Sequence, residues 1–150
     1  MDRPEGLHDD ETLIDLIGVR FSAGIQSSID ETPVNSMYRP SITQRHSYAR
    51  WVRNAGRAGF PIAGPEMVIG VSNERLLVWR TALIRARPRR FAGAVALTSI
   101  HSAGVHRRVF ATVLTLLLEG GTIVGVETLH GKHLRAFASA IPSFNDFKSL

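Results

Sequence analysis

The chain contains no cysteine, which excludes disulfide bonds, a thiol nucleophile and thiolate metal ligands. Lysine is scarce as well: Lys132 and Lys148 are the two lysines among 18 basic residues, and the other 16 are arginines. Arginine binds phosphate or carboxylate through two hydrogen bonds, but a GC-rich genome also raises its frequency, and we attribute most of these arginines to the genome. Apolar runs are short, as at residues 76–79, and none approaches the roughly 20 residues of a membrane-spanning helix.

What remains is the composition of an ordinary globular protein, 44% hydrophobic and 21% charged over 150 residues, which is enough for one domain with its own core. Charge is uneven, because residues 1–31 carry a net charge of −6 and the rest carries +11. Either the acidic segment folds back on a basic body or the charges are solvated, and we favour solvation. Residues 1–10 are expected to be disordered. Their acidic character is unlike a secretory signal, so a cytoplasmic location is expected.

Two short apolar runs, residues 67–71 and 76–79, flank a polar break at residues 72–75. Valine, isoleucine, leucine and tryptophan at this density, interrupted by the turn-forming Asn73, predict a β-hairpin. Neither run alternates between apolar and polar residues, so both faces of the hairpin are expected to be covered.

More strands are predicted on either side of this hairpin. Residues 11–21 are either a first strand or a short helix, since periodicity does not separate the two at this length. A further strand is predicted within residues 91–102, with residues 94–100 as its end. A second hairpin is predicted from residues 109–118 and 122–129 around the turn at Gly120 and Gly121, although a helix through residues 112–118 is the alternative.

Two helices are predicted by apolar residues at helical spacing. The first covers residues 41–56, where Trp51 and its neighbours form a stripe beside basic residues, and it packs on the sheet or, alternatively, lies on an anionic membrane. The second covers residues 131–142 and ends at Pro142. Its apolar face consists of Leu134, Phe137, Ala138 and Ile141.

The hairpin sequence Val-Ser-Asn-Glu-Arg-Leu-Leu-Val at residues 71–78, with the strands and the C-terminal helix after it, resembles the bacterial pleckstrin-homology-like (PH-like) domains. In that family a Val-Thr-Asp-x-Arg-Leu-Leu-Val hairpin recurs. The resemblance covers about residues 60–142 and implies an antiparallel β-barrel or sandwich capped by one amphipathic helix. It differs at Ser72-Asn73, at Gly120-Gly121, and in a loop-plus-helix insertion at residues 22–65.

Basic residues cluster at two places, and converging arginines there would bind an anion such as a lipid headgroup. The first cluster lies within residues 80–90, in an expected loop between strands. The second is Arg107 and Arg108, directly after His106. In the eukaryotic relatives of this family the lipid site lies in the first hairpin loop, where this chain carries Glu74, so the resemblance gives little support to lipid binding. The candidate anion-binding residues are Arg80, Arg85, Arg87, Arg89, Arg90, Arg107 and Arg108.

Other chemistry finds no support in the sequence. Nucleophile-elbow, Walker and dinucleotide-binding motifs are absent, so an enzyme and a cofactor are not expected. The aromatic residues fall in core patterns, so nucleic acid is not expected as a partner. No metal site is expected either, and the four histidines that stand in pairs are expected to be exposed: His101, His106, His130 and His133.

The sequence therefore predicts one α+β domain over residues 11–150, PH-like, with an additional N-terminal helix. The leading hypothesis is a non-catalytic cytoplasmic module that binds another protein, with a homodimer through a sheet edge as one form of that contact. The alternative is a peripheral adaptor that binds anionic lipid headgroups at the inner membrane surface through residues 80–90.

Overall fold

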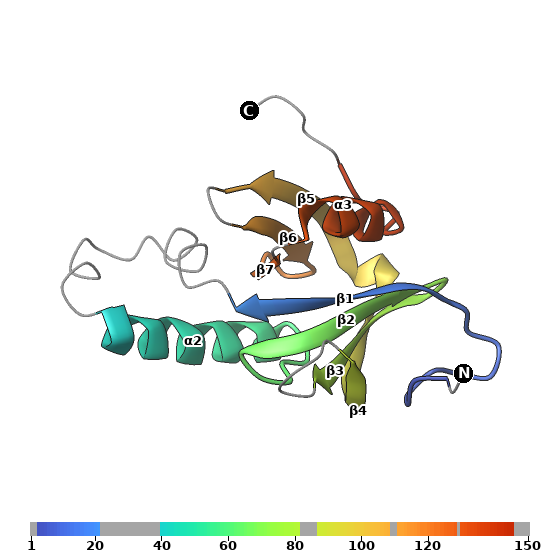
Figure 1. Ribbon diagram of the computed structural model, residues 1–150, viewed down its shortest axis with the longest axis horizontal. Helices are drawn as coiled ribbons and strands as arrows, with labels where there is room; N and C mark the ends of the chain where they lie inside the picture. Colours follow the sequence, from blue (N-terminus) through green and yellow to red (C-terminus); the bar gives the residue numbers. More distant parts are fainter. Residues whose placement is uncertain (1–2, 22–39, 82–86, 109–110, 129, 146–150) are drawn as a thin grey trace.

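The computed structural model describes residues 3–21, 40–81, 87–108, 111–128 and 130–145. They form one antiparallel sheet of seven strands in the order β4-β3-β2-β1-β7-β6-β5, followed by a C-terminal helix. The α+β class predicted from the sequence is confirmed. Figure 1 shows β1 between two halves of the sheet, with β2–β4 below it and β5–β7 above.

The first half of the sheet is a meander of four strands. β1 (Leu13–Phe21) pairs along most of its length with β2 (Glu66–Ser72), which pairs with β3 (Arg75–Thr81), and β3 pairs with β4 (Pro88–Ala96). Residues 11–21 thus hold a strand rather than a helix. The predicted hairpin is confirmed, and its strands are covered on both faces.

The second half begins at β5 (Ile100–Arg107), after a single 3-10 turn at Leu97–Ser99. β6 (Thr112–Leu118) and β7 (Ile123–Thr128) form the second predicted hairpin, and the helical alternative for residues 112–118 is wrong. β7 pairs with the end of β1 through Arg20 and Phe21, which joins the two halves.

The main core lies between the two halves of the sheet. It contains Ile69 and Val78 from the first half and Leu114 and Val126 from the second, all of them fully or almost fully buried. The C-terminal helix α3 (Gly131–Ser139) packs against β1, β5 and β6 and adds the predicted apolar face to this core. Leu134, Phe137 and Ala138 are the buried residues of that face within the helix. Ile141 is buried just beyond it, because the helix ends at Ser139 rather than at the predicted Pro142.

The helix α2 (Pro40–Arg57) lies between β1 and β2 in the chain and contacts β7. Its side chains are described from Tyr48 onward. Trp51 and Ala55 are buried in the main core, so this face of α2 packs on the sheet rather than facing solvent. No helix within the described ranges is both long and apolar enough to cross a membrane.

One predicted strand is misplaced, and one observed strand was not predicted. The strand expected within residues 91–102 starts earlier, as β4, and ends at Ala96. β5 was not predicted, because its Ser102, Gly104 and His106 lie on one face and break the apolar run. A strand needs apolar residues only on the face that meets the core, and here Ala103 and Val105 supply it.

Candidate functional site

Two of the four buried polar residues in the described part of the chain, Glu11 and Ser72, lie where an N-terminal strap, residues 3–12, crosses the outer face of the first half of the sheet. Residues 1–10 were expected to be disordered, yet in the structure residues 3–10 follow a defined path against β2, β3 and β4. The described start of the acidic segment, residues 3–12, therefore folds back on the body, which is the alternative we did not favour from the sequence. Figure 1 shows the strap as the blue loop before β1.

Main-chain carbonyls of the strap accept hydrogen bonds from two β3 side chains. The indole Nε1 of Trp79 donates to the carbonyl of Glu5 at 2.7 Å, and Nη2 of Arg75 donates to the carbonyl of Gly6 at 2.7 Å. Within the strap, the Arg3 guanidinium donates to the carbonyls of His8, Asp9 and Glu11, which closes the segment into a loop. The strap is thus folded on itself and bound to the sheet.

Beneath the strap lies a second apolar cluster, separate from the main core. Its fully buried members are Val68, Leu77 and Trp79, and Leu7 of the strap packs against them. The ring of Phe91 on β4 lies 6.1 Å from the ring of Trp79 at an interplanar angle of 58°, an edge-tilted geometry that aromatic pairs favour. Further residues that pack here are Leu13, Leu16 and Ala94.

Two glycines permit this packing because a side chain at either position would collide with an aromatic ring. A Cβ at Gly6 would lie 2.4 Å from the Phe91 ring, and the φ of Gly6 is +95°, which other residues rarely adopt. A Cβ at Gly70 on β2 would lie 2.7 Å from the Trp79 ring. The indole therefore lies across β2 and the strap lies across Phe91.

The turn between β2 and β3 links the strap to the sheet. The Ser72 hydroxyl accepts hydrogen bonds from the backbone N–H groups of Glu74, at 3.1 Å, and Arg75, at 2.9 Å. Asn73 and Thr12 bond reciprocally: the Asn73 N–H donates to the Thr12 carbonyl and the Thr12 N–H donates to the Asn73 side-chain oxygen. Serine and asparagine serve here as local turn residues, as their chemistry predicts.

The Glu11 carboxylate is the centre of the site and is only 3% exposed. Arg75 binds both of its oxygens: Nε donates to Oε2 at 3.0 Å and Nη2 donates to Oε1. The Ser72 hydroxyl donates to Oε2, and the backbone N–H of His8 donates to Oε1 at 3.0 Å. Such a bidentate, fully hydrogen-bonded pair is the arrangement in which a buried charge is tolerated.

These contacts lower the pKa of Glu11 from 4.5 to about 2, chiefly through the hydrogen bonds from Arg75, and they outweigh the opposing effect of burial. The same pair raises the pKa of Arg75. Because the folded-state pKa of Glu11 is depressed, its contribution to stability is complete above about pH 4.5 and is lost as the pH falls toward 2. A shift of this size corresponds to about 3 kcal/mol.

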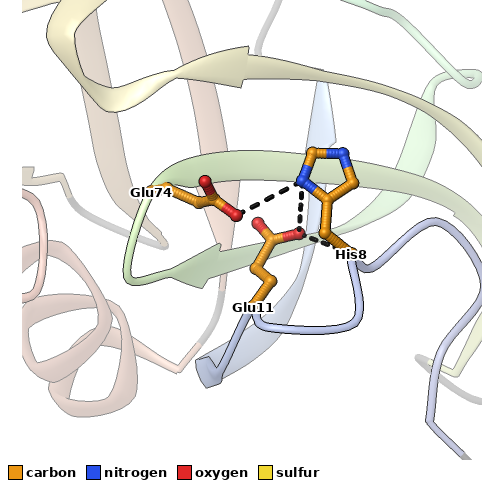
Figure 2. Close-up of side chains that lie close together, drawn as sticks. All are labelled: His8, Glu11 and Glu74. Carbon is orange, nitrogen blue, oxygen red and sulfur yellow. Dashed lines mark hydrogen bonds and ion pairs between the residues drawn. The ribbon is translucent and has the colours of Figure 1, made fainter.

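His8, Glu11 and Glu74 form a cluster whose candidate ligand atoms lie within 4.8 Å of one another. Figure 2 shows the imidazole of His8 facing both carboxylates; its Nδ1 lies 3.3 Å from Glu74 Oε1 and 3.8 Å from Glu11 Oε1. The residue types suit a divalent cation. However, the Glu11 oxygen nearest His8 already accepts a hydrogen bond from Arg75, whose positive charge would repel a cation. We therefore interpret the cluster as part of the hydrogen-bonded network around the Glu11–Arg75 ion pair.

The predicted arginines do not form one loop. Arg80 belongs to β3, and Arg89 and Arg90 belong to β4, so the expectation that they lie in a loop is wrong. Arg85 lies outside the described residues. Arg107 ends β5 and Arg108 follows it. The second predicted cluster therefore belongs to the edge strand β5, at the other end of the strand order from β4. The described arginines of both sets are exposed: Arg80, Arg87, Arg89, Arg90, Arg107 and Arg108.

The four paired histidines are exposed, as predicted. His133 on α3 bonds to the Asp15 carboxylate on β1, with Nε2 3.0 Å from Oδ1, and Arg20 bonds to Glu127 at 2.9 Å. Both contacts cross between elements at the surface. In the contacts of the described residues, neither carboxylate is paired with another group that would make it a general acid or base. Exposed pairs of this kind contribute little to stability.

Sequence reasoning did not identify Glu11 or Trp79 as members of a site. The sequence did predict a turn that contains Ser72 and Arg75. Their acidic partner, Glu11, lies 64 residues before Arg75 in the chain. No local spacing marks such a pair. No protein-family model matches the chain, and no curated protein matches its sequence.

Proposed function

We propose that this chain is a non-catalytic protein-binding module with a PH-like fold, located in the cytoplasm. Support for the PH-like assignment comes from the order of elements: a four-strand meander, a three-strand meander and a helix that packs against the interior between them. The hairpin sequence at residues 71–78, which resembles the recurring hairpin of that family, is a separate reason for the same assignment. Scaffolds of this kind are used with many ligands, so the function must be argued from surfaces rather than from the fold.

The observation that carries protein binding is the free edge of β4. Within the described part of the chain, β4 pairs with β3 on one side and with no strand on the other. The other edge strand, β5, is partly covered, because Ala103 N–H donates to the Ser143 carbonyl and its carbonyl accepts from Asn145. An uncovered edge offers unpaired N–H and C=O groups to a peptide strand.

The chemistry of Glu11 supports the non-catalytic part of this proposal. It is the most deeply buried carboxylate in the described part of the chain, and its oxygens are occupied by Arg75, Ser72 and the His8 N–H. A general base needs a pKa near the working pH and a free lone pair. With a pKa of about 2 and four hydrogen bonds, this carboxylate serves as a structural anion.

We expect peptides selected from a random displayed library against the full chain to bind along β4. Amide hydrogen exchange measured with and without a selected peptide should slow within Pro88–Ala96, since strand addition protects edge amides. β6, which is paired on both sides, serves as the internal control and should not change. Failure to enrich any peptide, or protection that excludes β4, would contradict the proposal. A β4-to-β4 homodimer would show the same protection at high protein concentration without peptide.

The second candidate is an anionic-lipid adaptor at the inner membrane surface, and one observation favours it. Arg80, Arg87 and Arg89 lie around the paired ends of β3 and β4, where Thr81 is opposite Pro88, and all three are exposed. In the same exchange experiment, vesicles of phosphatidylserine and phosphatidylcholine replace the peptide. Salt-dependent binding that is lost when Arg80, Arg87, Arg89 and Arg90 are replaced by serine would favour the lipid function over the protein-binding one.

A further inference from the structure

We infer that the outer face of β2–β4 is a second peptide-binding site, which the protein's own N-terminal strap occupies as a tethered ligand. Its ligand is a short acidic segment that carries a glycine followed by an apolar residue, with a glutamate four residues after the apolar one. In this chain those positions are Gly6, Leu7 and Glu11. This surface is separate from the free edge of β4, so either proposal can fail without the other.

The contacts of the strap with the sheet are of the kind that a bound peptide makes. The sheet provides three donors, which are the Trp79 indole, the Arg75 guanidinium and the Ser72 hydroxyl. Two of these donors reach main-chain carbonyls of the strap, at Glu5 and Gly6, and such contacts are available to any peptide. The strap contributes no residue to a helix or strand and none to the main core.

Three positions of the strap give the site its selectivity. At Gly6 a side chain is excluded by the Phe91 ring and by the positive φ. At the next position Leu7 covers the fully buried Leu77 and Trp79. At Glu11 a carboxylate meets both Arg75 and Ser72, and a neutral residue would leave Arg75 without its partner.

Charge complementarity also favours an acidic ligand. Residues 3–11 hold one arginine and four acidic residues, a net charge of −3, and the chain as a whole carries +5. Arg3 donates hydrogen bonds to three carbonyls of the strap itself, so the looped shape of the strap is stabilised by contacts within the strap. A tethered ligand of this kind competes with a free one at an effective concentration in the millimolar range.

The test uses the full chain with Glu11→Gln, which weakens the strap, and a labelled synthetic peptide of residues 3–12. We expect the peptide to bind the Glu11→Gln chain at least tenfold more tightly than the unaltered chain, because the tethered strap no longer competes effectively. The matched control is Asp10→Asn, which removes the same charge at an exposed neighbouring position and should behave like the unaltered chain. Peptides with Glu11→Gln or Gly6→Val should bind at least tenfold more weakly.

Equal binding to the Glu11→Gln and unaltered chains, or no binding to either, would overturn the inference. If the Glu11→Gln chain does not fold, the full chain with Gly6→Val is used instead, because it displaces the strap from Phe91 and leaves the Glu11–Arg75 pair in place. The peptide should then shift the Trp79 indole N–H resonance, and no shift would overturn the inference. A dimer with exchanged straps in the unaltered chain would also overturn it, since the occupant would be a second copy.

Discussion

Replacement of Arg75 by alanine is expected to lower the free energy of unfolding by about 3–5 kcal/mol, the usual cost of removing one partner of a buried ion pair. The reason is that Glu11 is 3% exposed and receives two of its hydrogen bonds from this guanidinium. The same side chain binds the Gly6 carbonyl and lies 6.0 Å from the Phe91 ring. Its loss therefore removes the strap's charge partner together with a main-chain contact.

Urea unfolding of the variant measures this effect, and the chain offers a matched control on the same strand. Arg80→Ala removes an exposed arginine of β3 and should change stability by no more than about 0.5 kcal/mol. Adding Glu11→Gln to Arg75→Ala should restore part of the loss, since no buried charge is then left unpaired. Equal effects of Arg75→Ala and Arg80→Ala would show that the buried pair does not hold the strap.

The second large effect is expected at Phe137, where substitution by alanine should lower the free energy of unfolding by about 3–5 kcal/mol. The Phe137 ring is fully buried in the main core, on the face of α3 that meets β1, β5 and β6. Removing it leaves a cavity between the helix and both halves of the sheet. Thermal or urea unfolding measures the change.

Lys132→Ala on the same helix is the control for Phe137, because Lys132 is exposed and its loss should change stability by no more than about 0.5 kcal/mol. A small effect at Phe137, comparable with that at Lys132, would mean that α3 does not close the interior of the sheet. The proposed PH-like assignment would then lose its main support, since it depends on a helix that packs against both meanders.

The strands and the C-terminal helix were predictable because their signals are local. In the first hairpin, β-branched and aromatic residues flank Asn73, and in the second a Gly120-Gly121 turn separates two apolar runs. In α3 the buried residues recur at helical spacing. β5 lacked this signal, since Ser102, Gly104 and His106 on its outer face dilute the apolar residues of its inner face.

The candidate site could not be predicted, since its parts come from distant places in the chain. Arg75 and Glu11 are 64 residues apart, and Trp79 and Glu5 are 74 residues apart. The acidic charge of the N-terminal segment did indicate that it could fold back on a basic body. Composition alone could not decide between that arrangement and solvated charge, because the choice depends on the apolar face that β2, β3 and β4 form together.

The measurement that tests the account most directly is the titration of the Glu11 side-chain carboxyl carbon by NMR in the full chain. With the strap seated and Arg75 bound to both oxygens, the resonance should not move between pH 7 and pH 4, and its midpoint should lie at about pH 2. A midpoint near 4.5, the ordinary value for a glutamate, would show that the carboxylate is not held by Arg75 and that the strap does not occupy the face of the sheet.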